Sequence, residues 1–323
     1  MKILVTGGAG YIGSVTVEQL LERGHTVAVL DNLERGHREA VDPRARLIAG
    51  DLRNRDAILG AMREVQPDAV VHFAAYALVG ESMTDPGLYF SNNLGGGMNL
   101  ASAMQETGVR RLVFSSTCAV YGVPERVPIT EDLPKNPANP YGESKLQFEK
   151  VLRWYEECHG FQAVRLRYFN AAGATERFGE DHQPESHIIP NVLKVALGQA
   201  ESVKIFGNDY KTPDGTCVRD YIHILDLAQA HILAVEGGKP GAYNLGNGSG
   251  YSVSEVVQTA REVTGHPIPV DFQARRPGDP DALVADARLA ARDLGWKPRH
   301  PELKTIIESA WNWTRRHPRG YRP

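Results

Sequence analysis

A glycine-rich turn directly after the first apolar segment is the feature that most constrains how this chain can fold. Residues 3–13 read Ile-Leu-Val-Thr-Gly-Gly-Ala-Gly-Tyr-Ile-Gly, a short strand pattern that leads through a G-x-x-G-x-x-G spacing into a helix pattern. Gly7 permits a tight turn, Gly10 lets a pyrophosphate approach the backbone, and Gly13 lets the helix pack closely on the strand. The helix N-terminus then offers unpaired N–H groups to an anion. The pattern predicts a dinucleotide-binding unit.

The acidic residue expected of such a unit stands at the end of the second strand pattern. The Asp31 carboxylate would accept a hydrogen bond from the adenosine 2′-hydroxyl and would repel a 2′-phosphate, which favours NAD over NADP. Arg35 and Arg38 keep NADP open as a lesser alternative. Asp51 follows the third strand pattern, where we expect the adenine ring. Small or flat residues after the fourth strand pattern would let the cofactor lie close, namely Phe73, Ala74 and Ala75.

Strand and helix patterns alternate through the first half of the chain. Buried strands are expected at Lys2–Thr6, Thr26–Leu30, Arg46–Ala49, Ala69–Phe73, Arg111–Ser115 and Ala163–Arg167, with helices such as Tyr11–Arg23, Arg55–Val65 and Tyr141–Cys158 between them. Such alternation implies right-handed crossovers and a parallel sheet that is covered on both faces. The predicted fold class is α/β, a Rossmann-type doubly wound parallel sheet.

The rhythm changes after about Gly173, where prolines and glycines become frequent. This part is predicted to form a smaller α/β lobe that binds the substrate. We therefore expect an NAD-binding domain at residues 1–173 and a second lobe at residues 174–323. A segment at about 217–240, which includes the helix pattern Ile224–Val235, is expected to return to the first domain.

Composition excludes several classes of protein. The chain has 323 residues with 36 Lys and Arg against 39 Asp and Glu, so it lacks the positive charge typical of proteins that bind nucleic acid or anionic membranes. Its 3 cysteines show no C-x-x-C spacing and predict no disulfide framework. The first strand pattern begins at Lys2, which leaves no room for a signal peptide, and no apolar stretch is long enough to cross a bilayer. A cytoplasmic location is expected.

The histidines predict no metal site, because the 11 of them show no ligand spacing. His72 and His223 stand inside apolar segments and are expected to be core residues.

The strongest catalytic signal is a tyrosine and a lysine at the start of a predicted helix. Tyr141 and Lys145 are four residues apart and therefore share one helix face. A phenol with a pKa near 10 is a poor base at neutral pH. A lysine charge about 5 Å away would stabilise the phenolate by roughly 3 kcal/mol at an effective dielectric constant of about 20. The pair can thus make the tyrosine a usable general base.

A strand end rich in hydroxyl groups precedes this helix. Phe114-Ser115-Ser116-Thr117 closes the fifth strand pattern, so its hydroxyls should face the crevice at the carboxyl edge of the sheet, where ligands bind in such folds. Taken alone, Y-x-x-x-K often marks only a pair on a helix surface. The glycine turn, the hydroxyl-bearing strand end and the pair, in this order, favour an active site.

Longer motifs give the chain a family resemblance. They include Thr6-Gly7-Gly8-Ala9-Gly10-Tyr11-Ile12-Gly13, Ser115-Ser116-Thr117-Cys118-Ala119-Val120-Tyr121-Gly122, Arg167-Tyr168-Phe169-Asn170, Phe206-Gly207-Asn208-Asp209-Tyr210, Val218-Arg219-Asp220-Tyr221-Ile222-His223 and Arg275-Arg276-Pro277-Gly278-Asp279. With them the chain resembles, nearly end to end, the UDP-glucose 4-epimerase family within the extended short-chain dehydrogenases/reductases.

The resemblance implies a set of site residues. Thr117, Tyr141 and Lys145 would be catalytic. The NAD-binding residues would be Gly7, Gly10, Tyr11, Ile12, Gly13, Asp31, Asn32, Asp51, Leu52, Phe73, Ala74, Ala75, Asn92, Thr117, Tyr141, Lys145 and Tyr168, with Tyr76 beside them. The UDP-sugar would contact Thr117, Tyr141, Asn170, His187, Ile188, Lys204, Ile205, Phe206, Arg219, Arg276 and Asp279.

The resemblance also implies a reaction. Tyr141 would remove the proton of the sugar 4-hydroxyl while hydride passes to NAD, and the 4-keto sugar would turn over and be reduced on its other face. The expected result is reversible epimerisation of UDP-galactose and UDP-glucose by a tightly bound NAD. A homodimer formed through the helix patterns Leu88–Thr107 and Tyr141–Cys158 is implied as well.

Several alternatives stay open at this point. A 4,6-dehydratase would carry an Asp-Glu pair where this chain has Cys118-Ala119, which disfavours it. Leu283 stands where the family has a bulky tyrosine that restricts the sugar pocket, so N-acetylhexosamines could be accepted. Epimerisation of UDP-uronic acids or UDP-pentoses, a non-catalytic NAD-binding sensor and a net-redox dehydrogenase are the other candidates.

Overall fold

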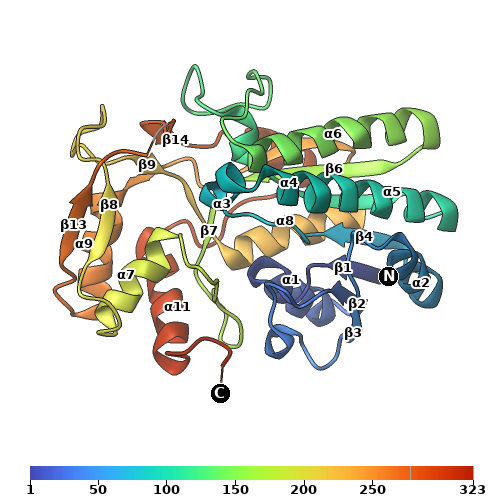
Figure 1. Ribbon diagram of the computed structural model, residues 1–323, viewed down its shortest axis with the longest axis horizontal. Coiled ribbons are helices and arrows are strands. Elements are labelled where there is room, and N and C mark those ends of the chain that lie inside the picture. Colours follow the sequence, from blue (N-terminus) through green and yellow to red (C-terminus); the bar gives the residue numbers. More distant parts are fainter. Residues whose placement is uncertain (277, 323) are drawn as a thin grey trace.

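A parallel sheet of seven strands forms the centre of the larger part of the molecule (Figure 1). The computed structural model describes residues 1–276 and 278–322. The strands of this sheet are β1 (Lys2–Thr6), β2 (Thr26–Asp31), β3 (Arg46–Ala49), β4 (Ala69–His72), β5 (Arg111–Thr117), β6 (Gln162–Tyr168) and β11 (Gly241–Leu245). Their spatial order is β11-β6-β5-β4-β1-β2-β3, and every neighbouring pair is parallel. The order reverses between β1 and β4, and sheets of this kind bind their ligands in a crevice outside the carboxyl ends of the strands at such a reversal.

Helices cover both faces of the sheet. They are α1 (Tyr11–Glu22), α2 (Arg55–Val65), α3 (Val79–Thr84), α4 (Pro86–Tyr89), α5 (Gly96–Thr107), α6 (Pro140–His159) and α8 (Ile224–Gly237), with 3₁₀ turns at Arg38–Ala40 and Cys118–Tyr121. Alternate strand residues point to opposite faces. Accordingly, Ile3 and Val5 of β1 pack in one core with α1 and α8, whereas Leu4 packs in a second core with α2, α5 and α6.

The smaller lobe is built from short strand pairs and three helices that share a core of their own. β7 (Asn170–Ala172) pairs with β10 (Tyr221–His223), and β8 (Val203–Phe206) pairs with β13 (Val270–Gln273). β9 (Val218–Arg219) pairs with β12 (Tyr251–Ser252) and β14 (Ala282–Leu283). The three helices are α7 (Ile188–Ala196), α9 (Val253–Thr264) and α11 (Leu303–Arg316), whereas α10 (Arg288–Leu294) packs against β11 and α8 of the larger part.

The predicted Rossmann-type doubly wound α/β fold is confirmed, and two local expectations are wrong. β3 is only half-buried because it is the edge strand, with a neighbour on one side alone. The helix expected at Leu88–Thr107 is not one regular helix. It begins earlier, at Pro86, and contains a π-helical segment at Phe90–Gly95 before α5 begins.

The chain crosses between the two parts more than once. After β9 and β10 it enters α8, which packs on α1, and then β11 at the edge of the large sheet. Figure 1 shows the yellow and orange segments of the smaller lobe on one side of the molecule, and α8 near the middle of the view, away from that lobe's strands. The division of the chain at residue 173 into two domains stays a prediction.

Three smaller expectations can be compared with the structure. Cys118, Cys158 and Cys217 are all free thiols, as predicted. His72 and His223 are buried core residues, as predicted. Across residues 1–276 and 278–322, we find no helix whose length and apolar character would let it cross a membrane.

Candidate active site

The glycine-rich turn lies at the carboxyl end of β1 and packs tightly on its neighbours. Gly7 has a φ of +75°, and a Cβ at this position would lie within 3.0 Å of backbone atoms of Phe73 and Ala74. A Cβ at Gly13 would strike the carbonyl oxygen of Gly7. Gly10, by contrast, meets only the Gly7 carbonyl oxygen, at 3.4 Å. Two glycines are therefore needed for packing, while the third leaves the start of α1 open to a ligand.

Acidic and amide groups line the ends of β2 and β3. The Asp31 carboxylate accepts hydrogen bonds from the backbone N–H groups of Ala9 (3.0 Å) and Leu33 (2.9 Å), so it fixes the glycine turn. Burial raises the pKa of Asp31, and the two hydrogen bonds act against this. The Asn32 amide donates to Asp51 at 3.0 Å. The carboxylate of Asp51 is also paired with Arg53 at 2.6 Å, which holds the pKa of Asp51 well below its usual range.

Other residues predicted to bind the cofactor surround this crevice. Phe73 is partly exposed after β4 and packs on His231, with ring centroids 4.6 Å apart. Tyr11 is buried and donates its hydroxyl to the carbonyl oxygen of Gly173 at 2.6 Å. Leu52 has its side chain in the apolar core, so only its backbone is free to face a ligand. Ala74, Ala75 and Ile12 are partly exposed.

The π-helical segment carries two buried asparagines. Asn93 accepts a hydrogen bond from the Tyr76 N–H at 2.9 Å and donates to the Tyr76 carbonyl oxygen at 3.0 Å. Asn92 donates to the Asn93 side chain at 3.0 Å. Single π-helical turns are frequent at functional sites because they redirect side chains. Asn92 was predicted from the sequence and Asn93 was missed, although the two asparagines are adjacent in the chain.

The predicted catalytic residues meet at the carboxyl end of β5. Helix α6 is capped by Asn139, whose side chain accepts from the Gly142 N–H at 2.8 Å, and this places Tyr141 in the first turn. Lys145 follows on the same face, is only 3% exposed, and donates to the Ser115 carbonyl oxygen at 2.8 Å. The Thr117 hydroxyl accepts from the Ala119 N–H at 3.1 Å, and its side chain is a neighbour that favours the ionised form of Tyr141.

Burial, rather than the lysine charge, dominates the ionisation of the pair. It raises the pKa of Tyr141, and the neighbouring Thr117 side chain only partly offsets the effect. It also lowers the pKa of Lys145 to about 7, against the charge of Glu149. From the sequence we expect Lys145 to lower the pKa of Tyr141; the burial of both groups, which removes the water around them, acts in the opposite direction.

A buried ion pair supports the back of the catalytic strand. Glu149, one turn after Lys145 on α6, pairs with Arg167 of β6 at 2.5 Å and accepts from the Ser116 hydroxyl at 2.5 Å. These residues were missed, although the spacing of Lys145 and Glu149 on one helix face was a usable signal. On the other face of β5, the hydroxyls of Ser115 and Tyr168 hydrogen-bond to each other.

The charged residues predicted to bind the substrate lie in the smaller lobe, on its strands or shortly after them. The Arg219 guanidinium pairs with the Asp279 carboxylate at 2.5 Å. Arg276 stacks over the ring of Phe206, with its guanidinium carbon 4.0 Å from the ring centroid. Lys204 is exposed on the same face of β8 as Phe206, because strand residues alternate. Ile205 points the other way into the core, so its side chain is unavailable to a ligand.

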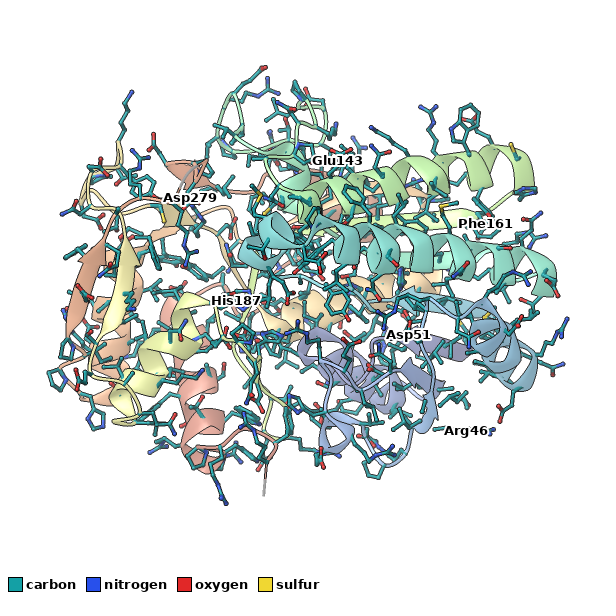
Figure 2. The ribbon with its side chains drawn as sticks, viewed as in Figure 1. Arg46, Asp51, Glu143, Phe161, His187 and Asp279 are labelled. Carbon is teal, nitrogen blue, oxygen red and sulfur yellow. The ribbon has the colours of Figure 1, made fainter. Side chains whose placement is uncertain are left out.

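The remaining substrate candidates lie between the two parts of the molecule. His187 precedes α7, and Figure 2 draws it between Asp279 and Asp51. Burial acts to lower the pKa of His187, but the Glu180 carboxylate, 2.5 Å away, outweighs it and raises this pKa to about 10. Ile188 is the first residue of α7. Asn170 donates its amide to the Asp220 carbonyl oxygen at 3.1 Å.

Comparison with known proteins assigns this architecture to a family. The model of the NAD dependent epimerase/dehydratase family matches residues 3–246. This chain belongs to that family. The UDP-glucose 4-epimerase of Halalkalibacterium halodurans is 53% identical to this member, over 99% of the present chain and 98% of the relative.

Solved structures of the family agree with the fold of this epimerase family member. The UDP-glucose 4-epimerase from Bifidobacterium longum in complex with NAD+ and UDP matches with a TM-score of 0.95 and 40% identity, covering 99% of this chain and 100% of the other. The UDP-glucose 4-epimerase from Brucella ovis in complex with NAD matches with a TM-score of 0.93 and 46% identity, covering 96% and 97%. The resemblance inferred from the sequence motifs is confirmed.

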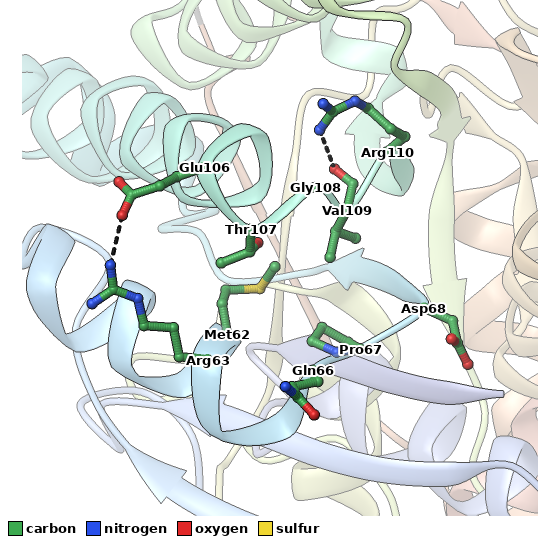
Figure 3. Close-up of a pocket in the computed structure, with 10 residues that line it drawn as sticks. All are labelled: Met62, Arg63, Gln66, Pro67, Asp68, Glu106, Thr107, Gly108, Val109 and Arg110. Atoms are coloured by element: carbon green, nitrogen blue, oxygen red, sulfur yellow. Dashed lines mark hydrogen bonds and ion pairs between the residues drawn. The ribbon is translucent and has the colours of Figure 1, made fainter.

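A surface hollow elsewhere on this family member is unrelated to the crevice (Figure 3). It lies where α2 and α5 end and where β4 and β5 begin, which is the amino edge of the sheet. Arg63 and Glu106 form an ion pair at 2.8 Å on its wall. Ligands of doubly wound sheets bind at the opposite, carboxyl edge. The side chains predicted to be catalytic are all at that carboxyl edge.

Proposed function

We propose that this epimerase interconverts UDP-galactose and UDP-glucose by inverting carbon 4 of the hexose with a retained NAD. One observation carries the proposal. Tyr141, Lys145 and Thr117 meet at the carboxyl edge of the large sheet, in the same chain as a smaller lobe that presents Arg219 and Arg276. A proton-transfer group beside a dinucleotide crevice, with cations for a diphosphate, suits this reaction.

The crevice residues fit NAD. The turn at Gly7 and Gly13 leaves no room for side chains, while Gly10 and the start of α1 stay open to a pyrophosphate. Asp31 is placed to accept from a ribose hydroxyl, since each carboxylate oxygen has a second lone pair. When bound, NAD supplies the acceptor and later the donor of the carbon-4 hydride. We propose that it is held by Gly7, Gly10, Tyr11, Ile12, Gly13, Asp31, Asn32, Asp51, Leu52, Phe73, Ala74, Ala75, Asn92, Thr117, Tyr141, Lys145 and Tyr168.

The chain's own residues would then divide the work at the sugar. Tyr141 takes the proton of the 4-hydroxyl. It returns a proton to the same oxygen when carbon 4 is reduced on its other face. Thr117 hydrogen-bonds the same oxygen and keeps it in line with the phenol. The charged form of Lys145 would attract the Tyr141 phenolate and favour its ionisation, while the burial of both groups acts against their charged forms.

The smaller lobe would hold the UDP group. The arginines can form bidentate bonds to phosphate oxygens, and Asp279 can accept from the uridine ribose. Tight binding of this remote group retains the reactive sugar through the turnover. We propose as substrate contacts Asn170, His187, Ile188, Lys204, Phe206, Arg219, Arg276 and Asp279, together with the backbone of Ile205.

Leu283 favours a second candidate substrate class. It lies on β14 in register with Arg219 of β9, so it is close to the proposed diphosphate contact. A leucine is smaller than tyrosine and leaves more space beside the sugar. The same site would then also accept N-acetylhexosamines attached to UDP.

Further proposals concern assembly, location and the two domains. Trp154 of α6 is 55% exposed and Met98 of α5 is 48% exposed on helices that pack side by side, which supports a homodimer through these helices. Free cysteines support a reducing, cytoplasmic setting. We also propose that residues 1–173, with a returning segment near 217–240, bind NAD and that the rest of residues 174–323 bind the UDP-sugar.

The deciding experiment is a conversion assay without added cofactor. The purified protein is incubated with UDP-galactose and the nucleotide sugars are separated by chromatography. A mixture dominated by UDP-glucose, without accumulation of NADH, is the expected result. No conversion, even with NAD supplied, contradicts the proposal, and UDP-N-acetylgalactosamine in a parallel incubation tests the second substrate class.

A further inference from the structure

Two glutamates and two histidines gather at one point on the segment that leads into α7. Glu180, His182, Glu185 and His187 each bring one possible ligand atom to this point, and these atoms all lie within 4.8 Å of one another. The sequence repeats the order Glu-x-His twice, at residues 180–182 and 185–187. Counting histidines alone concealed this spacing, which led to the expectation of no metal site.

The distances within the cluster suit a small tetrahedral ion. Around a zinc ion with bonds of about 2.0–2.1 Å, ligand atoms stand about 3.3 Å apart. The Glu180 carboxylate oxygen lies 3.1 Å from Nδ1 of His182, and the Glu185 oxygen lies 3.4 Å from Nδ1 of His187. The 2.5 Å contact between Glu180 and His187 must lengthen by less than 1 Å, and wider spacings, such as the 4.0 Å between His182 Nδ1 and the Glu185 carboxylate, must shorten.

Burial and charge favour a divalent cation at this point. The side chains of Glu180 and Glu185 are only 7% and 3% exposed, and buried carboxylates need neutralising charge. One divalent ion with two neutral imidazoles balances two carboxylates as well as two protonated histidines do. The imidazoles of His182 and His187 are 31% and 46% exposed, so an ion can enter from solvent.

The surrounding contacts hold the cluster from the cofactor side. Arg35 donates to the carbonyl oxygen of Gln183 at 2.8 Å, and the ring of Tyr11 packs edge-on against His182 at 6.2 Å. The Glu185 carboxylate accepts from the N–H groups of Ser186 and His187, both at 2.8 Å. These bonds fix the backbone of the segment in the arrangement that brings the four ligand groups together.

We propose that Glu180, His182, Glu185 and His187 form a binding site for one first-row divalent metal ion, with Zn²⁺ the best match. Mixed imidazole and carboxylate ligands suit zinc, whereas magnesium and calcium prefer oxygen ligands alone. One consequence rests on the proposed function. When the ion binds His187, this side chain is no longer free to contact the UDP-sugar. Zinc therefore competes with the UDP-sugar.

Direct metal binding is the primary test, because it requires no turnover. The full-length protein is freed of metal with a chelator and titrated with Zn²⁺ by calorimetry and with Co²⁺ by visible absorption. One ion per chain and a tetrahedral cobalt spectrum are expected. His182→Gln and Glu185→Gln should each weaken binding at least about 10-fold. His25→Gln is the matched control, since His25 also contacts a carboxylate, that of Glu236, at 3.0 Å.

Three results would overturn the proposal. The first is a zinc affinity that is unchanged in both cluster variants. The second is an equal loss of affinity in His25→Gln. The third is a cobalt spectrum typical of Co²⁺ coordinated octahedrally by water. Melting curves in chelator check that the variants fold, and if one of them does not, the other decides. In the active enzyme zinc should raise the KM for UDP-galactose without lowering kcat. A protein that binds zinc but converts no UDP-sugar contradicts the proposed function alone, and an active epimerase that binds no zinc contradicts this inference alone.

Discussion

The proposed cofactor side and the proposed substrate side of this molecule are built in different ways. On the cofactor side, backbone atoms and short continuous motifs form the site, and Gly7 and Gly13 fit their neighbours without space for one more carbon. On the substrate side, charged side chains come from separated segments, such as Arg219 on β9 and Arg276 after β13, and Arg276 is exposed. The proposed cofactor side therefore depends on tight backbone packing, whereas the proposed substrate side depends on individual side-chain contacts.

This difference predicts how each side tolerates change. A substitution in a tight backbone turn moves the whole turn, so it should abolish cofactor binding outright. The loss of one exposed side chain removes one interaction and should weaken substrate binding by a limited factor. The predictions below test this contrast, beginning with the largest expected effect.

Gly7→Ala should yield a protein that retains essentially no NAD. The added Cβ would meet Phe73 and Ala74 backbone atoms within 3.0 Å at a φ of +75°, and these atoms cannot move aside cheaply. The measurement is the nicotinamide cofactor released on denaturation, quantified by chromatography. Gly24→Ala is the control: its φ is +82° but nothing lies within 4 Å, so it should cost only about 1–2 kcal/mol of stability. Equal NAD content in both variants would contradict the prediction that the tight packing at Gly7 is needed to bind the cofactor.

Tyr141→Phe should lower kcat by about 10²–10⁴-fold, because it removes a general base and leaves the ring in place. NAD content should stay that of the unaltered protein. Tyr155→Phe, on the same helix but outside the crevice, is the matched control and should keep full activity. Activity that survives in Tyr141→Phe would assign the proton transfer to another group.

Arg276→Ala should raise the KM for UDP-galactose by roughly 10- to 100-fold, since a hydrogen bond to a charged group contributes about 1.5–3 kcal/mol. NAD content and kcat should change little. Arg275→Ala is the adjacent control, because the Arg275 guanidinium stacks over Tyr210 at 3.8 Å and pairs with Asp281. An Arg276→Ala protein that loses its NAD would break the contrast between the two sides.

Acid should destabilise the folded state through His72 on the proposed cofactor side. Burial lowers the pKa of His72 to about 3, against 6.5 for the free side chain. The unfolded chain therefore binds a proton that the folded one does not, so stability is present above pH 6.5 and is lost as the pH falls toward 3. His72→Asn should show a flatter dependence of unfolding free energy on pH in this window. The exposed His159→Asn should leave the slope unchanged, and a steeper slope for His72→Asn would contradict the assignment.

Much of this protein was predictable from short stretches of its sequence. The alternation of strands and helices, the glycine turn and the pair Tyr141 and Lys145 all depend on residues that are neighbours in the chain. Local spacing alone determines which face of a helix or strand such residues share. For this reason the Rossmann-type sheet and the shared helix face of Tyr141 and Lys145 followed from the sequence.

Other features were decided only by the tertiary structure, because they depend on what surrounds each group. Burial acts against the expected lowering of the pKa of Tyr141, the side chain of Ile205 lies in the core, and β3 is half-exposed at the edge of the sheet. The pairing of Glu149 with Arg167 joins residues of different elements. Desolvation and pairing between distant segments are properties of the packed molecule, and no local pattern of residues contains them.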